Sequence, residues 1–170
     1  MSITDGIRQI ANFMEIAART APKARGWDNL VIKILEKKDL NEFADKMIKI
    51  GNKTQRPQTF KRDAQSVRKS ECSVLIGTIY KTLGLDCGFC GIPTCKQAEE
   101  KNITCAYNSG DLGIAVGSAV STANKFHVDN RIMYTMGYTA VKENILGTDI
   151  RKALGIPLSA TGKNIFFERK

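Results

Sequence analysis

Four clustered cysteines are the residues of this chain best suited to do chemistry. Their spacing is C-x2-C-x4-C-x9-C, formed by Cys87, Cys90, Cys95 and Cys105. A chain of 170 residues buries enough surface to fold without disulfides, so the clustering favours a metal or cofactor site over cystine bridges. Thiolates are soft ligands, and four of them suit zinc or an iron–sulfur cluster rather than magnesium or calcium.

The gaps between these cysteines favour an iron–sulfur cluster. Structural zinc usually takes two separated pairs of ligands around one small ion. Here three cysteines lie within nine residues and the fourth follows at a distance, an arrangement that wraps a larger cluster. Gly88, Gly91 and Pro93 lie between the ligands, and glycine lets backbone amides approach the cluster sulfurs. We therefore expect a cluster-binding loop over residues 86–106.

The cysteine motif also carries a family resemblance. Residues 87–95 (CGFCGIPTC) resemble the iron–sulfur motif of the corrinoid iron–sulfur protein large subunit and related domains. Residues 71–140, with DCGFCGIPTC, CAYNSGDLGIAVGSAVS and VDNRIMYTMGY, resemble a family of bacterial and archaeal ferredoxin-domain proteins. The resemblance implies a 4Fe-4S cluster held by Cys87, Cys90, Cys95 and Cys105. The family name describes a cluster and implies no substrate.

A second resemblance covers other parts of the chain. Residues 17–35 (AARTAPKARGWDNLVIKIL) resemble the segment of flavin-dependent nitroreductases in which an A-P-S-x-x-N-x-Q-P-W loop joins a helix to a strand. Members of that family usually form homodimers and bind flavin mononucleotide (FMN) at the shared interface, so the resemblance implies both. It places Pro22, Lys23 and Arg25 in the loop facing the flavin. Lys23 replaces the family's serine, and the arginine-rich phosphate-binding start is missing.

The pattern of apolar residues predicts an α+β fold. Helices are predicted over residues 5–19, 39–51, 111–125 and 130–145, with a short helical turn at 151–154. Strands are predicted at 30–35 and 165–167, and residues 72–79 fit a buried strand or a buried helix. We expect one domain over 1–170, in which helices pack on a small, mostly antiparallel sheet of nitroreductase-like form with the cysteine-rich segment as a cluster-binding insertion.

Some further residues have a plain structural interpretation. Cys72, inside an apolar run, is expected to be a small buried side chain rather than a ligand. Asp111 and Asp129 are expected to cap helices, although Asp111 is also near enough to Cys105 for a positioning role. His127, the only histidine, is expected at a helix end. Small residues at 113, 117–119 and 121 predict close packing against another backbone or a flat cofactor.

The net charge of +9 favours an anionic partner, which could be nucleic acid, a phosphorylated cofactor or an acidic protein. The densest basic stretch, residues 53–69, is either a solvated helix face or an anion-binding surface. The sequence contains no apolar run of the ~20 residues that span a bilayer, and its first residues do not form a signal peptide. These features predict a cytoplasmic protein without membrane association.

Three functions remain open at this point. The leading hypothesis is a 4Fe-4S redox protein that exchanges single electrons with an acidic protein partner or a bound flavin. The second is an FMN-dependent, nitroreductase-like oxidoreductase in which the cluster relays electrons. The third is a zinc-stabilised nucleic-acid-binding module, which the charge favours. Nucleic acid is the less favoured partner, because aromatic residues are not interleaved with the basic stretch.

Overall fold

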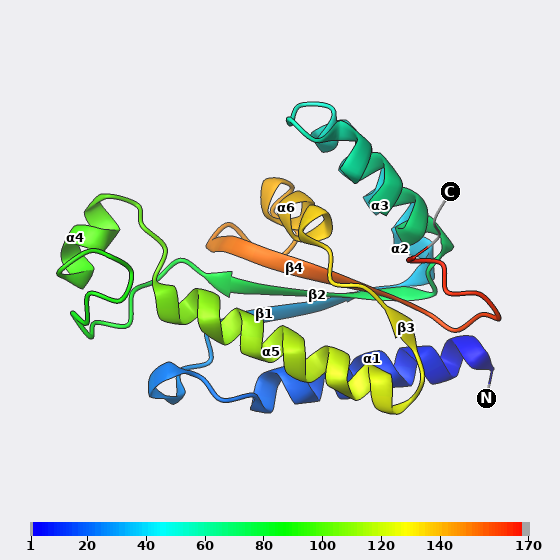
Figure 1. The fold of residues 1–170 in the computed structure, drawn as a ribbon, viewed down its shortest axis with the longest axis horizontal. Helices are drawn as coiled ribbons and strands as arrows, with labels where there is room; N and C mark the ends of the chain where they lie inside the picture. Colours follow the sequence, from blue (N-terminus) through cyan, green and yellow to red (C-terminus); the bar gives the residue numbers. More distant parts are fainter. Residues whose placement is uncertain (1, 168–170) are drawn as a thin grey trace.

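The computed structural model describes residues 2–167 and contains an antiparallel sheet with helices on both faces (Figure 1). The elements in chain order are α1 (Ile3–Thr20), η1 (Ala24–Gly26), β1 (Leu30–Leu35), α2 (Lys37–Gly51), α3 (Pro57–Lys69), β2 (Cys72–Ile79), α4 (Cys95–Glu100), α5 (Ala106–Lys125), β3 (Asp129–Asn130), α6 (Tyr134–Lys142) and β4 (Ile150–Ser159). The strand order is β1-β2-β4-β3, and each neighbouring pair is antiparallel. The predicted α+β class is confirmed.

Strand β2 is the centre of the sheet. It pairs with β1 on one side and with β4 on the other, so Ile76 lies opposite both Ile32 and Leu154. Successive side chains of a strand point to opposite faces. Val74 therefore packs in one core and Leu75 in the other, and both are fully buried. Burial on both faces explains why residues 72–79 are mostly apolar and show no helical or strand period.

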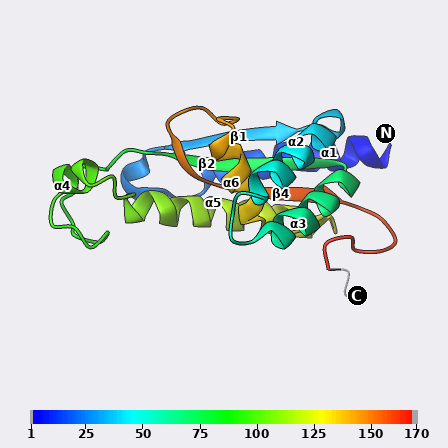
Figure 2. The same cartoon turned by 90° about the horizontal axis from the view of Figure 1, so that it is seen from above.

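The two faces of the sheet are covered by different helices. Helices α1 and α5 lie side by side on one face, and α2, α3 and α6 lie on the other (Figures 1 and 2). Met14 of α1 anchors the first core, and Phe60 of α3 and Met136 of α6 anchor the second. Burying one such side chain is worth about 1.5–3 kcal/mol. Each face therefore has its own core, and the sheet holds α5 in a fixed place.

Two predicted elements near the C-terminus are wrong, and a third has different bounds. Residues 151–154 belong to β4, because pairing with β2 over its whole length overrides the helical preference of their composition. The helix predicted at 130–145 is shorter: α6 begins at Tyr134 after a Met133 N-cap, and Asp129 lies in β3 instead of capping. Residues 165–167 form turns and a bend instead of a strand, and Phe166 is buried in the core beneath α2, α3 and α6.

Helix α5 begins earlier than predicted. Its first residue is Ala106 and its N-cap is Cys105, so Asp111 lies inside the helix instead of capping it. The predicted close packing is present on one side, where the Ser118 hydroxyl donates to the Ala17 carbonyl of α1 at 3.0 Å. Gly113, on the outer side, is exposed, with nothing near the position of a Cβ. Within residues 2–167, no helix is long and apolar enough to cross a membrane.

Candidate metal centre

The four clustered cysteines lie in a lobe that projects beyond one end of the sheet. This cysteine lobe, residues 80–105, connects β2 to α5 and contains the short helix α4 (Figure 1). Cys87 and Cys90 are in its loops, Cys95 is the first residue of α4, and Cys105 is the N-cap of α5. Two helix starts therefore carry two of the four thiols, which gives these two candidate ligands defined positions in a loop-rich segment.

All four cysteines line one hollow. It is a narrow hollow between the cysteine loops, α4 and the first turn of α5, with about 300 Å³ of space when open solvent is included. Cys90, Cys95 and Cys105 are partly buried and Cys87 is exposed. The Phe89 ring packs against the Tyr107 ring with their centroids 5.3 Å apart, and both residues line the hollow. The structure thus brings together four thiols that are spread over nineteen positions of the sequence.

The backbone of the lobe is bent so that an amide faces a thiol. Asp86, Gly88 and Gly91 have positive φ angles of 46°, 68° and 83°. The Asp86 amide donates to the Cys95 sulfur at 3.4 Å, and the Cys95 amide donates to Asp86 Oδ1 at 2.6 Å. Backbone N–H groups directed at cysteine sulfurs stabilise the charge of an iron–sulfur cluster and help set its potential. This reciprocal pair fixes Cys95 relative to the loop that carries Cys87.

The donor chemistry of the hollow fits an iron–sulfur cluster. All four thiols are free, and together they supply the complete all-cysteine ligand set of a 4Fe-4S cluster. Among residues 2–167, no three His, Cys, Asp or Glu side chains converge closely enough to form a site for a single metal ion. The four cysteines line one hollow, and a 4Fe-4S cluster is bound by one cysteine on each of its four irons. The ligand assignment itself stays a prediction.

Cys72 is placed where the sequence predicted. It begins β2, is 3% exposed and packs in the core between the sheet and helices α1 and α5. Burial raises the pKa of its thiol to about 12. The thiolate is the form that binds metals, so this thiol is a poor ligand as well as a remote one. Cys72 is therefore a natural control for the cysteines of the lobe.

A polar junction attaches the cysteine lobe to the rest of the fold. Asn108, in the first turns of α5, is 1% exposed and donates to the Lys81 carbonyl, while its own oxygen accepts from the Asn29 amide at 3.0 Å. Arg25 donates to the Leu83 carbonyl at 2.7 Å. The loop between α1 and β1 and the start of the cysteine lobe are thus connected directly. Sequence reasoning missed Asn108 and Asn29, since an isolated asparagine carries no pattern.

The three residues predicted to face a flavin lie in this same loop, but in different settings. Pro22 is exposed, and the Arg25 guanidinium also lies 4.3 Å from the centre of the Trp27 ring. The Lys23 side chain is only 4% exposed, and its ammonium group donates to the carbonyls of Ala18, Arg19 and Ala21 at the end of α1. In this arrangement Lys23 caps a helix, and its ammonium group does not extend into solvent toward a ligand.

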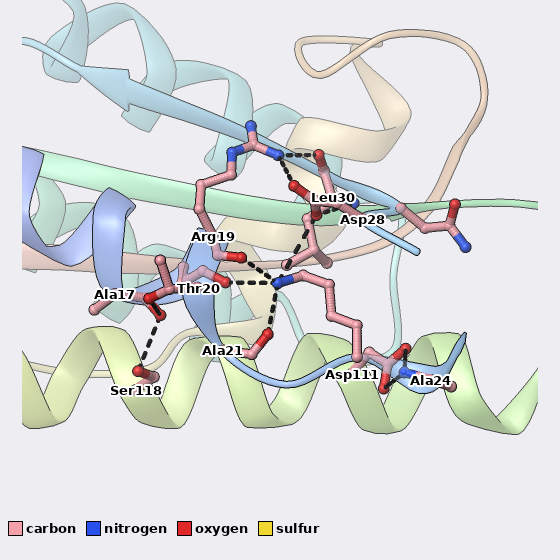
Figure 3. A network of polar contacts seen from close by, with 12 residues as sticks. Ala17, Arg19, Thr20, Ala21, Ala24, Asp28, Leu30, Asp111 and Ser118 are labelled. Carbon is pink, nitrogen blue, oxygen red and sulfur yellow. Dashed lines mark hydrogen bonds and ion pairs between the residues drawn. The ribbon is translucent and has the colours of Figure 1, made fainter. Parts of the chain in front are cut away.

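Asp111 has a positioning role of another kind. Its two carboxylate oxygens accept the Ala24 amide at 3.2 and 3.1 Å, which holds the loop after α1 against α5 (Figure 3). His127 is exposed and follows the C-terminal end of α5 with a φ of 57°. Asp129 and Asn130 line a second hollow with His127, while Arg131 donates to the Phe166 carbonyl. None of these residues lines the cysteine hollow.

Comparison with known proteins identifies the family. Residues 101–169 match a family described as "Uncharacterized protein containing a ferredoxin domain (DUF2148)". An uncharacterized protein from Archaeoglobus fulgidus is 37% identical over 174 residues, a match that covers 97% of this chain and 92% of the relative. The chain belongs to this ferredoxin-domain family. The matched segment includes Cys105 and all of α5, whereas the other three lobe cysteines precede it.

Solved structures with similar folds are nitroreductases and related flavoproteins. A nitroreductase with bound FMN from Desulfitobacterium hafniense has a TM-score of 0.63 at 11% identity, covering 91% of this chain and 78% of that one. A putative nitroreductase in complex with FMN from Desulfovibrio desulfuricans gives 0.61 at 11%, with 95% and 78% covered. A BluB-like flavoprotein from Clostridium difficile gives 0.58 at 15%, with 91% and 82% covered. The ferredoxin-domain protein therefore has a nitroreductase-like fold, and both predicted resemblances are confirmed.

Proposed function

We propose that this ferredoxin-domain protein is a redox protein that holds one 4Fe-4S cluster on Cys87, Cys90, Cys95 and Cys105 and exchanges single electrons through it. The observation that carries the proposal is the convergence of these four thiols on one hollow. A cysteine on every iron leaves no position open for a substrate, which favours electron transfer over Lewis-acid catalysis.

The residues around the hollow each have a stated part in this proposal. The Asp86 amide donates to the Cys95 sulfur and stabilises its negative charge. The Asp86 carboxylate accepts the Cys95 amide and keeps that turn closed. Phe89 and Tyr107 line the hollow, and their packed rings give one wall of it an apolar surface. Phe89 is also 68% exposed, so it gives the lobe an apolar point at which a partner protein can dock.

The partner we propose is an acidic redox protein. The chain carries a formal charge of +9, and a 4Fe-4S cluster with four thiolates contributes a charge of about −2, so the loaded protein stays strongly basic. Opposite charge accelerates the encounter of two redox proteins and is screened by salt. Electron transfer to such a partner is therefore expected to slow as the ionic strength rises.

A second candidate function is an FMN-dependent oxidoreductase in which the cluster relays electrons. Two observations favour it: FMN is present in structures with this fold, and the loop after α1 is hydrogen-bonded to the cysteine lobe. Lys23 does not fit as a flavin ligand, since its ammonium group is committed to the carbonyls at the end of α1. A flavin would have to be held by other groups, with Pro22 and Arg25 as the contacts available from this loop.

We also propose that two copies of the chain associate through α1 and α5. Large apolar side chains are exposed on the outer side of these helices: Ile16 and Ile114 are 58% and 50% exposed, and Phe13 stacks on Phe126 with a centroid distance of 6.0 Å. Residues 112–124 carry no charge. Open space beside Gly113 and Gly117 allows the backbone of another helix to approach closely. A second copy, with the same uncharged surface, fits this face.

Anaerobic purification followed by absorption spectroscopy and metal analysis tests the main proposal. We expect a broad band near about 400 nm that bleaches with dithionite, and about four iron and four sulfide per chain. Replacing Cys90 by Ser should remove most of the band, while the matched variant Cys72→Ala should keep it. A colourless protein with one zinc per chain would refute the proposal and make oligonucleotide binding the next function to test. Additional flavin bands would support the second candidate.

A further inference from the structure

A third hollow, separate from the cysteine hollow and from the one lined by His127, lies between α5, α6 and the first half of β4. It encloses about 980 Å³ of space, solvent included, and its apolar lining includes Leu112, Val141 and Leu154. Three of its lining side chains are basic and exposed: Lys142, Arg151 and Lys152. None of its lining residues is acidic. The hollow therefore combines an apolar wall with concentrated positive charge.

Helix α6 and strand β4 make this wall rigid. Gly137 of α6 lies directly on the β4 backbone, and a Cβ there would come within 1.7 Å of the Ala153 carbonyl oxygen. Gly155 is equally close to α6, since a Cβ on it would lie 2.4 Å from the Met136 Cβ. A wall built from a helix packed on a strand is already formed before any ligand arrives.

The basic groups of the hollow are held in place without being neutralised by carboxylates. The Arg151 guanidinium lies 4.8 Å from the centre of the Tyr80 ring, and the Lys152 ammonium group donates to the Ser109 hydroxyl at 3.2 Å. Lys142 lies 5.5 Å from the centre of the Tyr138 ring. Within residues 2–167, none of the three cations makes an ion pair. Their charge is available to a ligand.

We propose that this hollow binds a small organic anion in which a flat aromatic ring carries one acid group. Tyr134 and Tyr138 supply aromatic surface, Leu112 and Val141 supply apolar contact, and the three cations bind the acid group. The site lies close to the cysteine lobe, because Leu112 is seven residues beyond Cys105 on the same helix, about 10 Å along its axis at 1.5 Å per residue. The proposal does not depend on whether the lobe holds a cluster.

Titration of the full-length protein with 2-naphthoate tests the site, and its uncharged counterpart 2-naphthamide is the matched probe. We expect saturable binding of 2-naphthoate that shifts the backbone amide NMR signals of Gly137, Ala153 and Leu154. We expect the amide to bind about tenfold more weakly, because it loses the charge-assisted contacts. Equal affinity for the two probes, or saturable binding without shifts at these residues, would overturn the proposal.

Charge variants separate this site from a general attraction to a basic protein. Replacing Arg151 and Lys152 by Gln should weaken 2-naphthoate binding about tenfold. The control variant Lys61→Gln/Lys125→Gln removes the same charge from exposed positions outside the hollow, and its affinity should stay unchanged. Lys142→Gln provides an independent variant on α6. The proposed site would be refuted if the control pair lowered the affinity for 2-naphthoate as much as the Arg151 and Lys152 substitutions do. It would also be refuted if neither those substitutions nor Lys142→Gln lowered that affinity.

Discussion

The side-chain amide of Asn108 is predicted to hold the cysteine lobe to the rest of the fold, and replacing Asn108 by Ala tests this directly. The residue is 1% exposed, accepts from the Asn29 amide and donates to the Lys81 carbonyl. Truncation to Ala leaves the Asn29 amide and the Lys81 carbonyl without these hydrogen bonds. Each unpaired polar group costs about 1–3 kcal/mol when it is shielded from water. We expect the free energy of unfolding to fall by about 2–4 kcal/mol.

The same substitution should act locally as well as globally. Native-state hydrogen exchange in Asn108→Ala should accelerate in residues 80–105 more than in β2, because the lobe loses its main polar attachment. Asn124→Ala is the matched control on α5: Asn124 is exposed and accepts one hydrogen bond from Asn130. That variant should change stability by less than about 0.5 kcal/mol. Equal losses in both variants, or unchanged exchange in the lobe, would refute the reasoning.

Three further predictions follow from packing, burial and exposed surface. Gly137→Ala places a Cβ 1.7 Å from the Ala153 carbonyl oxygen, and thermal denaturation should show a free energy of unfolding lower by about 3 kcal/mol or more. The Cβ of Gly113→Ala faces open space, so this variant should be neutral or raise the free energy of unfolding by up to about 1 kcal/mol. Burial raises the pKa of Cys72 from 9.0 to about 12. The protonated thiol therefore stabilises the fold below pH 9, and this contribution is lost as the pH rises toward 12. The free energy of unfolding, measured against pH, should show this loss in the parent chain and not in Cys72→Ala. In sedimentation experiments Ile114→Lys should convert the proposed dimer to monomers, because it places a charge in the proposed interface, while Lys125→Gln at the end of the same helix should not.

The cysteine centre was readable from sequence because ligand spacing is local. Four cysteines within nineteen positions restrict the chemistry before any fold is known. Their arrangement around one hollow depends on the lobe's attachment through Asn108 and Arg25, whose partners lie far away in the sequence. A residue that makes long-range hydrogen bonds leaves no periodic pattern, so the sequence indicated the candidate ligands but not the residues that position the lobe that carries them.

The errors in predicted elements have physical causes. Residues 151–154 combine charged residues with Ala and Leu, which favour helix, but the long pairing of β4 with β2 decides the outcome. Asp129 resembles a helix cap, yet its segment pairs with β4 as a short edge strand. Lys23 stands in a loop that resembles a flavin-binding loop, and only the three-dimensional path of that loop shows its ammonium group capping α1.

Mössbauer spectroscopy of anaerobically prepared, iron-57-labelled protein tests the central claim most directly. We predict that essentially all the iron belongs to one 4Fe-4S cluster per chain, and that one electron per chain converts the whole spectrum to that of the reduced cluster. Cys72→Ala should give the same spectra, because Cys72 lies in the core and away from the hollow. A spectrum of isolated mononuclear iron, or a cluster that persists after Cys90 and Cys95 are replaced by serine, would contradict the account.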